Sequence, residues 1–347
     1  MSPHEKQKPL GAAAGLAGSV ALESGPELGE LAEVKARGYW EQVWIRFKRD
    51  KVAIGSGIFI IFLILVSFVG AAIAQKLLGH GPNDLFFDGV DDRLIPKGPM
   101  SRAHDPRTGE EALLILGADG SLGRDLFLRL LYGGRVSLEV AMLSTLGAMS
   151  VGVVLGAIAG YFRGWIDTII ARITEVTMAF PALLFIIALA STVGGRVDSI
   201  TLGIFSPGVI TLVLVFTTFG WFYPCRIIRA QVLSLREKEF IEAARMIGAS
   251  DARIIRSHLL PHLVAPIIVY STLVVAGYVL GEAGLSFLGL GIKLPTASWG
   301  NLLSTAPEFY TAQPWLMVWP GLAVLLTTLS FNLLGDGLRD AFDPRSM

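Results

Sequence analysis

Histidine and cysteine, which supply the nitrogen and sulfur ligands of metal sites, are few in this sequence, with five His and one Cys that mostly lie far apart. Of the five histidines, only His258 and His262 have the i,i+4 spacing that places two side chains on one face of a helix. Pro261 lies between them and no third ligand is nearby, so packing is favoured over a metal site. The chain also lacks a G-x-x-x-x-G-K-[S/T] phosphate-binding loop, so it cannot supply ATP hydrolysis by that route. We therefore expect no metal ion, no cofactor and no catalytic residue.

One carboxylate stands out because it lies within a long apolar stretch. Glu282 is flanked by Gly281 and Gly284, and an isolated carboxylate among apolar residues is costly unless it faces a polar cavity or a partner. It either lines a polar pathway or holds an adjacent helix break, and the break is favoured.

Three further residues in apolar stretches have structural and functional interpretations. Arg172 and Glu175 are three residues apart, and a structural ion pair along one helix face is favoured over a substrate site. Pro181 removes a backbone hydrogen bond and should kink its helix, which fits gating and static packing equally.

The composition places these residues in a membrane protein. Only 17% of the 347 residues are charged and 52% are hydrophobic, whereas soluble domains have about a quarter charged. The 29 Lys and Arg side chains equal the 29 Asp and Glu side chains, which argues against a nucleic-acid-binding protein.

Six apolar stretches are long enough to cross a bilayer. Val52–Ala74 runs for about 23 residues without a charge, enough at a rise of about 1.5 Å per residue to cross a core of about 30 Å. We therefore predict an all-α membrane protein with six transmembrane helices. The other five are placed at about Val136–Gly160, Thr168–Thr192, Pro207–Ile228, Val264–Leu288 and Trp315–Leu334.

The segments around these helices predict the topology. Residues 1–37 are read as a disordered cytoplasmic tail, favoured over a signal peptide because the stretch is weakly hydrophobic. Residues 38–74 hold an aromatic and basic helix at the membrane surface, then the first span. Residues 75–135 form an extracytoplasmic segment of loop and short structure, and residues 136–347 contain the other five spans. Both termini are expected in the cytoplasm.

Glycines recur every fourth residue in two of the spans. Gly152, Gly156 and Gly160 form one such series, and Gly277 and Gly281 form another. Small residues at this spacing let helices approach closely. The sequence favours equally that these glycines lie at contacts between subunits or at contacts within the chain.

Residues 237–261, between the fourth and fifth spans, predict a cytoplasmic helical hairpin. Phe240, Ile241, Ala244 and Ile247 share one face of a first helix, which Gly248 ends. Ser250 can cap a second helix that runs to Pro261. Such an amphipathic element must bury its apolar face on its own subunit or on a partner.

The hairpin also carries a motif. Glu242-Ala243-Ala244, three residues, Gly248, nine residues and His258-x-Leu260-Pro261 resemble the EAA loop of ABC-importer permeases. Further matches extend the resemblance to the second permease subunit of dipeptide and oligopeptide importers, over about Trp44 to the C-terminus. They are Leu122-Gly-Arg-Asp125, Leu130-Leu-Tyr-Gly133, Arg135-Val-Ser-Leu138, Glu282, Leu285-Ser-Phe-Leu-Gly-Leu-Gly291, Trp299-Gly300, Gly335-Asp-Gly-Leu-Arg-Asp340 and Asp343-Pro-Arg345.

The resemblance implies a type I ABC importer permease fold that imports peptides across the cytoplasmic membrane. It implies three kinds of partner: a homologous second permease, cytoplasmic ATPase subunits and an extracytoplasmic solute-binding protein. The motif residues of the hairpin would couple to the ATPase, and Glu282 and Pro181 are candidates for the pathway or its gating.

Three other functions remain open. The same scaffold can import nickel or a peptide-like antibiotic. A gradient-driven secondary transporter is less favoured, because neither midplane ionisable sites nor internal repeats are evident. A membrane scaffold that only recruits a cytoplasmic partner is the least favoured.

Overall fold

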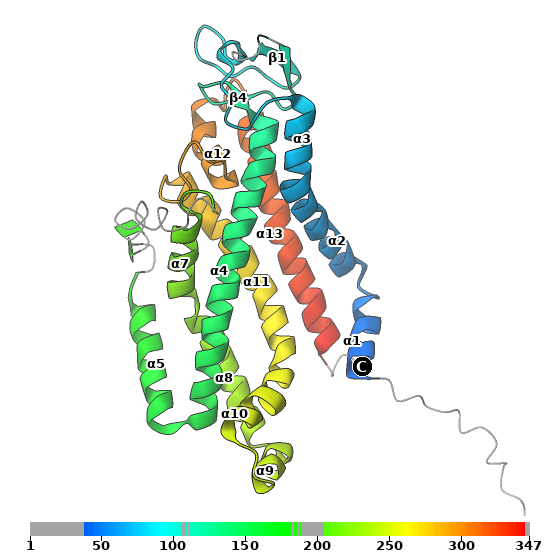
Figure 1. The fold of residues 1–347 in the computed structure, drawn as a ribbon, viewed down its shortest axis with the longest axis vertical. Helices are drawn as coiled ribbons and strands as arrows, with labels where there is room; N and C mark the ends of the chain where they lie inside the picture. Colours follow the sequence, from blue (N-terminus) through cyan, green and yellow to red (C-terminus); the bar gives the residue numbers. More distant parts are fainter. Residues whose placement is uncertain are drawn as a thin grey trace, which may run out of the picture.

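Long helices run side by side through the molecule, with small strands at one end and a helical hairpin at the other (Figure 1). The computed structural model describes residues 38–105, 109, 111–181, 184–185, 187–188 and 205–343 of the chain. The α-helices are α1 (Tyr39–Phe47), α2 (Lys51–Leu65), α3 (Ala71–Leu78), α4 (Leu126–Phe162), α5 (Gly164–Ala179), α7 (Val209–Gly220), α8 (Phe222–Arg236), α9 (Glu239–Met246), α10 (Asp251–Arg253), α11 (Leu260–Phe287), α12 (Trp299–Thr305) and α13 (Trp315–Phe342).

Short π and 3-10 turns connect some of these helices. Two π turns, η1 (Val66–Gly70) and η3 (Ile254–Leu259), lie between α2 and α3 and between α10 and α11. Two 3-10 turns, η2 (Phe87–Gly89) and η4 (Ala306–Glu308), lie outside the long helices. Each π turn continues the helix on either side of it, so α2 to α3 and α10 to α11 are uninterrupted helical segments.

Four helical segments in the described part of the chain are long and apolar enough to cross a membrane: Lys51–Leu78, Leu126–Phe162, Asp251–Phe287 and Trp315–Phe342. A fifth candidate is the pair α7 and α8, bent by 41°. These correspond to five of the six predicted spans. The remaining one, Thr168–Thr192, begins in α5 and continues into residues outside the described ranges, so the total of six stays a prediction.

The bend between α7 and α8 has a local cause. Gly220 ends α7, and Pro224 lies in the first turn of α8. A proline in the first turn of a helix is tolerated because its missing N–H has no partner there in any case. One apolar stretch of sequence therefore folds into two helices rather than one straight span.

The second span begins earlier than predicted, at Leu126 rather than Val136. Asp125 caps the helix, since its Oδ1 atom accepts hydrogen bonds from the backbone N–H groups of Phe127 (2.7 Å) and Leu128 (3.1 Å). Residues 126–135, assigned above to the outer segment, thus form the first turns of α4.

The outer segment contains strands, which the all-α prediction omitted. β1 (Ser101–His104) pairs antiparallel with β2 (Glu111–Leu114), and β3 (Ala118–Asp119) pairs with β4 (Arg124–Asp125). Four apolar strand residues form a small buried cluster with Phe86, which precedes the strands. They are Ala103, Ala112, Leu114 and Ala118. The fold is therefore mostly helical, with two small sheets above the helices.

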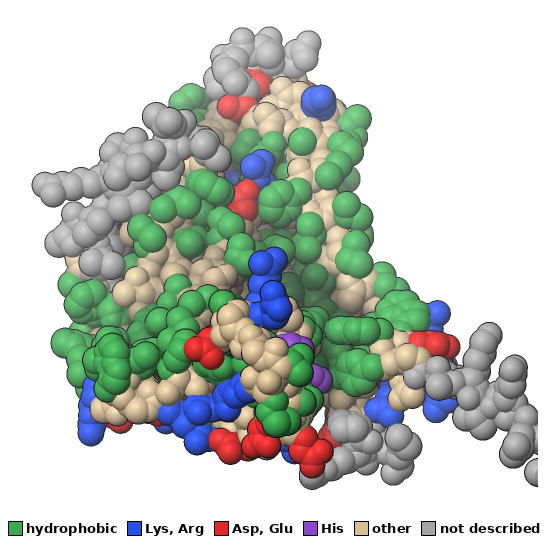
Figure 2. Space-filling model, turned by 60° about the horizontal axis from the view of Figure 1, so that its bottom comes forward, with side chains coloured by type: hydrophobic (Ala, Val, Ile, Leu, Met, Phe, Trp, Pro, Cys, Tyr) green, Lys and Arg blue, Asp and Glu red, His purple; other side chains and the backbone are tan. Residues whose placement is uncertain are grey.

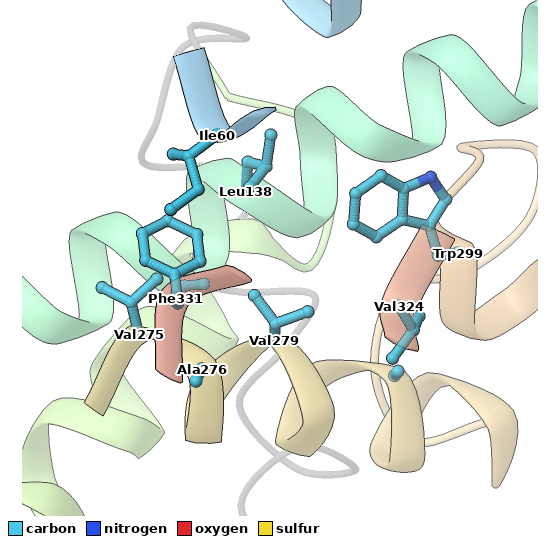
Figure 3. Close-up of a cluster of buried hydrophobic side chains, with 10 residues drawn as sticks. Ile60, Leu138, Val275, Ala276, Val279, Trp299, Val324 and Phe331 are labelled. Atoms are coloured by element: carbon cyan, nitrogen blue, oxygen red, sulfur yellow. The ribbon is translucent and has the colours of Figure 1, made fainter. Parts of the chain in front are cut away.

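The main core joins helices from distant parts of the sequence. Ile60 of α2, Leu138 of α4, Val279 of α11, Trp299 of α12 and Phe331 of α13 belong to one buried cluster (Figure 3). Contact of this kind fixes the helices relative to one another. By contrast, many apolar side chains of α2 are exposed on its outer side, as expected for a surface that faces lipid.

The first glycine series packs α4 against α8 within the same chain. A Cβ atom added at Gly152, Gly156 or Gly160 would lie between 2.6 and 2.9 Å from backbone oxygens of α8 or of Trp221 just before it. These glycines therefore make contacts within the chain. Gly277 differs, because a Cβ there would meet no described atom within 4 Å.

Gly156→Ala is expected to destabilise the protein by about 1–3 kcal/mol, because an added methyl group forces two backbones apart. Its Cβ would lie 2.6 Å from the carbonyl oxygen of Cys225. Thermal unfolding in detergent measures the effect. Gly55→Ala is the matched control, because an added Cβ meets no described atom within 4 Å there. Equal melting temperatures for the two variants would contradict close α4–α8 packing.

The predicted surface helix forms as α1 and docks on the end of α13. Arg46 Nη1 donates a hydrogen bond to the carbonyl oxygen of Asp343 (2.7 Å), and the rings of Trp40 and Phe342 make an edge contact at 6.0 Å. Val43 is buried, whereas Trp44 is exposed. The helix is thus confirmed, and its place at the membrane surface stays a prediction.

Candidate functional site

The first helix of the hairpin, α9, ends in a Schellman motif built by Gly248. Gly248 has φ +81°, which a residue with a side chain rarely adopts. Its N–H donates to the carbonyl oxygen of Arg245 (2.9 Å), and the N–H of Ala249 donates to that of Ala244 (3.0 Å). This is the pattern in which a left-handed glycine closes a helix. The sequence prediction for Gly248 is confirmed.

The apolar face of α9 was only partly predicted. Ile241 and Ala244 are buried in a cluster with α8, with the end of α4 and with the start of α11. Phe240 is 39% exposed and its ring lies 5.1 Å from that of His262. Ile247 is 85% exposed, because it follows the last residue of α9 and lies at the tip of the hairpin. Ile247 is therefore not buried within its own subunit, and its burial on a partner stays a prediction.

The second helix of the hairpin does not end at Pro261. Its three-residue start, α10, continues through the π turn η3 into α11, so the chain stays helical from Asp251 to Phe287. A π turn changes the hydrogen-bond register, and Pro261 falls in the first turn of α11, where its missing N–H is tolerated. His258, Leu260 and Pro261 are therefore part of one helix that reaches the membrane core.

The hairpin presents charged and apolar side chains together at one end of the molecule. Glu242 and Ala243 are exposed on α9, and Met246 is 82% exposed beside Ile247. Figure 2 shows Lys, Arg, Asp and Glu side chains gathered around this end, below flanks that are mainly hydrophobic. Met246 and Ile247 therefore form an exposed apolar pair beside charged side chains at the tip of the hairpin.

Glu282 is completely buried and lies at the centre of a hydrogen-bonded cluster. Ser137 Oγ of α4 donates to Glu282 Oε2 (2.6 Å), and Ser286 Oγ of α11 donates to Glu282 Oε1 (2.7 Å). We call these three residues the carboxylate cluster.

Both serines of the carboxylate cluster also accept hydrogen bonds from backbone N–H groups of the chain that follows α11. The N–H of Trp299, at the start of α12, donates to Ser137 Oγ (3.2 Å), and the N–H of Ile292 donates to Ser286 Oγ (3.0 Å). Gly300 lies so close that an added Cβ would be 2.6 Å from Ser286 Cβ. Residues from four motif segments of the sequence therefore meet at Glu282.

A separate groove runs between α4 and α11 and does not include Glu282. Its volume is about 690 Å³. The residues that line it are Met142, Leu143, Thr145, Leu146, Met149, Ser150, Val153, Val154, Ile267, Ser271 and Val275. None of them is charged, and two are methionines, whose flexible side chains adapt to different ligands.

The other predicted residues lie away from this groove. Arg172 Nη1 is 2.6 Å from Glu175 Oε2 on an exposed face of α5. The helix α5 ends at Ala179, and Phe180 is extended with ψ 135°, as expected for a residue before a proline. Pro181 therefore follows the end of α5 rather than kinking a continuous helix, which corrects the prediction.

The outer segment holds a buried ionic cluster that was not predicted from the sequence. His80 Nε2 lies 2.8 Å from Asp125 Oδ2, and Arg129 Nε lies 2.6 Å from Asp119 Oδ2, with all four side chains at most 3% exposed. Arg129 also donates to Asn83 Oδ1 (2.9 Å). These buried pairs join Asp125 to His80, and Asp119 of the outer segment to Arg129 of α4, so they hold the outer segment against the start of α4. Only the coincidence of acidic and basic residues before α4 signalled this cluster.

The stability of the outer segment is expected to depend on pH through His80. Burial disfavours protonated His80, but its hydrogen bond to Asp125 and the negative charge there outweigh burial and raise the pKa of His80 above 6.5. The stabilisation is therefore fully present below about pH 6.5 and is lost as the pH rises through the raised pKa of the folded protein. The melting temperature of the wild type should fall as the pH rises from about 6 to about 9. This fall should be absent in His80→Asn.

His104→Asn is the matched control for this pH dependence. His104 also contacts a carboxylate, with Nδ1 2.7 Å from Asp88 Oδ2, but the two side chains are 63% and 41% exposed. An exposed pair contributes little to stability. A pH profile that His104→Asn alters and His80→Asn does not would contradict the role of the buried pair.

No group of three or more His, Cys, Asp or Glu side chains is placed to hold a metal ion in the described ranges. His258 is half-buried on η3, and His262 contacts Phe240. The preference for packing over metal binding at these histidines stays a prediction.

Comparison with known proteins gives two family matches. Residues 152–347 match the binding-protein-dependent transport system inner membrane component family, and residues 38–93 match the N-terminal TM domain of oligopeptide transport permease C.

Individual relatives cover almost the whole chain. The glutathione transport system permease protein GsiD of Pectobacterium atrosepticum is 37% identical over 91% of this chain and 94% of its own. The dipeptide transport system permease protein DppC of Alkalihalophilus pseudofirmus is 37% identical over 88% of this chain and 90% of its own. GsiD of Escherichia coli O157:H7 is 36% identical over 90% of this chain and 92% of its own. The chain is a multi-pass membrane transport component that belongs to the family of binding-protein-dependent transport system inner membrane components.

Proposed function

We propose that this chain is one permease subunit of an ATP-driven ABC importer that moves di- or oligopeptides across the cytoplasmic membrane. The observation that carries the proposal is the near full-length similarity to permease proteins of glutathione and dipeptide transport systems. The sequence motifs that resemble peptide-importer permeases support the same branch, and three of them contribute the residues of the carboxylate cluster.

The hairpin is proposed as the docking element for a cytoplasmic ATPase. Its inner face, with Ile241 and Ala244, is used to pack on its own subunit. Its outer face, with Glu242, Met246 and Ile247, is free of such packing within the described chain. Because the chain has no phosphate-binding loop, ATP hydrolysis is expected on that partner.

The groove between α4 and α11 is proposed as this subunit's part of the solute pathway. Hydroxyls from Thr145, Ser150 and Ser271 are interspersed with apolar side chains along it, which suits solutes with varied side chains. A homologous second permease would complete the pathway, and an extracytoplasmic solute-binding protein would deliver the solute. Glu282 is proposed to hold α12 and the loop before it rather than to contact solute.

The membrane arrangement is proposed as six spans with both termini in the cytoplasm. Residues 38–74 would form the surface helix and first span, residues 75–135 would lie outside, and residues 136–347 would form the permease core. The basic residues around the hairpin support a cytoplasmic location for it, because cytoplasmic connections carry an excess of Lys and Arg.

Uptake by cells that carry or lack this chain tests the function. We expect deletion to remove uptake of labelled dipeptide, oligopeptide or glutathione, and the intact gene on a plasmid to restore it. Uptake of radioactive nickel or of a peptide-like antibiotic, with no peptide uptake, would establish the alternative solute. Peptide uptake that survives ATP depletion and stops when the ion gradient is dissipated would contradict the ABC class.

A further inference from the structure

Tyr161, in the last turn of α4, joins α4 to both parts of the hairpin. Its hydroxyl donates a hydrogen bond to Asp251 Oδ1 of α10 (2.6 Å). The guanidinium of Arg245, on α9, lies 5.4 Å from the centre of the Tyr161 ring. Tyr161 is 4% exposed, whereas Asp251 and Arg245 are exposed, so a buried tyrosine is contacted by two residues of the hairpin surface.

The end of α8 is connected to the same residue. The guanidinium of Arg236 lies 5.7 Å from the centre of the Tyr161 ring, and Arg236 Nη1 also donates a hydrogen bond to the carbonyl oxygen of Tyr161. Tyr161 therefore contacts α8, α9 and α10 at the base of the hairpin.

These contacts differ in kind from the apolar contacts around them. Ile241 and Ala244 pack against the same region, but apolar contacts are not directional and allow side chains to slide. A hydrogen bond to a carboxylate fixes both distance and direction, and it is stronger than one between neutral groups. The hydroxyl of Tyr161 is thus suited to hold the hairpin and α4 in one register.

The same helix reaches the groove. Val153 and Val154 line the groove and lie about two helical turns before Tyr161 on the continuous helix α4. An uninterrupted helix moves as a unit over this length. A displacement of the hairpin would therefore reach the groove wall if the contact at Tyr161 holds.

We propose that Tyr161 is a positioning residue for energy coupling, through which displacement of the hairpin moves α4 and the groove wall. The inference rests on the proposed docking of an ATPase on the hairpin. Tyr161 touches neither nucleotide nor solute in this role. Its contribution is to keep the hairpin and α4 moving together.

Tyr161→Phe tests the role because it removes the hydroxyl and keeps the ring. The importer is reconstituted in liposomes with its ATPases, second permease and solute-binding protein, and the labelled dipeptide moved per ATP hydrolysed is measured. We expect ATPase recovery and ATP hydrolysis to be retained while solute per ATP falls by about tenfold, the effect of losing one hydrogen bond to a charged group. Asp251→Asn should lower the ratio in the same direction, and combining the two should add little.

Arg163→Gln is the matched control. Arg163 Nη2 lies 2.6 Å from Glu237 Oε1 in the turn that follows Tyr161, but this pair is exposed. Its loss should leave solute per ATP unchanged. Unchanged solute per ATP in Tyr161→Phe would overturn the role, as would equal losses of transport and ATP hydrolysis, which indicate damaged structure only. Failure of the wild-type chain to assemble with an ATPase would instead overturn the proposed function of the hairpin.

Discussion

Replacing Ile247 with aspartate is expected to abolish recovery of the ATPase with this chain while leaving the chain folded in the membrane. Ile247 is 85% exposed, so its side chain contributes little to folding. In a complex it would be buried against the partner, and a carboxylate there would be desolvated without a counter-charge. The expected weakening of the complex is about 100-fold or more. Co-purification in mild detergent, with the ATPase quantified by mass spectrometry, measures it.

Leu94→Asp is the matched control for this prediction. Leu94 is 58% exposed in the outer segment, and its φ of 60° is one that aspartate tolerates. The same chemical change at the opposite end should leave ATPase recovery unchanged. Full recovery of the ATPase with Ile247→Asp would show that the tip of the hairpin is not the docking surface.

Two further variants distinguish the contribution of the hairpin's surface charge to ATPase docking from the contribution of its backbone shape. Glu242→Lys reverses an exposed charge on α9, so it should weaken docking without changing stability. Gly248→Pro should weaken docking by another route, because proline cannot adopt the φ of +81° that closes α9. Membrane insertion should be normal in both cases. Undiminished ATPase recovery with both variants would contradict the coupling assignment.

Glu282→Ala is expected to lower the free energy of unfolding by about 2–5 kcal/mol, among the largest effects of any single change. The substitution leaves a cavity and removes the acceptor of both Ser137 and Ser286. The two serines also accept from the N–H groups of Trp299 and Ile292, so α12 and the loop before it lose their support. Thermal unfolding in detergent, with the yield of folded protein, measures the loss.

Glu175→Ala is the matched control, since it removes a carboxylate whose ion pair with Arg172 is exposed. Its effect should be within about 1 kcal/mol. Glu282→Gln keeps the shape and one acceptor oxygen, so it should fall between wild type and Glu282→Ala. A Glu282→Gln protein with normal assembly and normal transport would exclude a role for the charge in the pathway.

Local features of the sequence were read correctly where one short segment decides the structure. Gly248, four residues after the buried Ala244, ends α9 because a left-handed residue is needed there, and glycine adopts that conformation without strain. The apolar spans likewise follow from unbroken runs of apolar residues, which have few alternatives in a bilayer. The end of the second hairpin helix was misread because a π turn ahead of Pro261 leaves no clear sequence signal.

Contacts between distant segments were beyond reach of the sequence. Glu282 was expected to need a polar partner, but its donor Ser137 lies 145 residues earlier. The pairing of His80 with Asp125 and of Arg129 with Asp119 depends on how the outer segment folds over α4. Periodicity and spacing report neighbours along a helix or strand, and they carry no information on which segments meet in space.

A pull-down of the tagged chain from its native membrane in mild detergent, with partners identified by mass, tests the central claim most directly. An importer permease should bring down an ATPase with a phosphate-binding loop and a second, homologous permease. Recovery of the chain alone, monodisperse and able to move solute into liposomes without ATP, would contradict the ABC importer and identify a gradient as the source of energy.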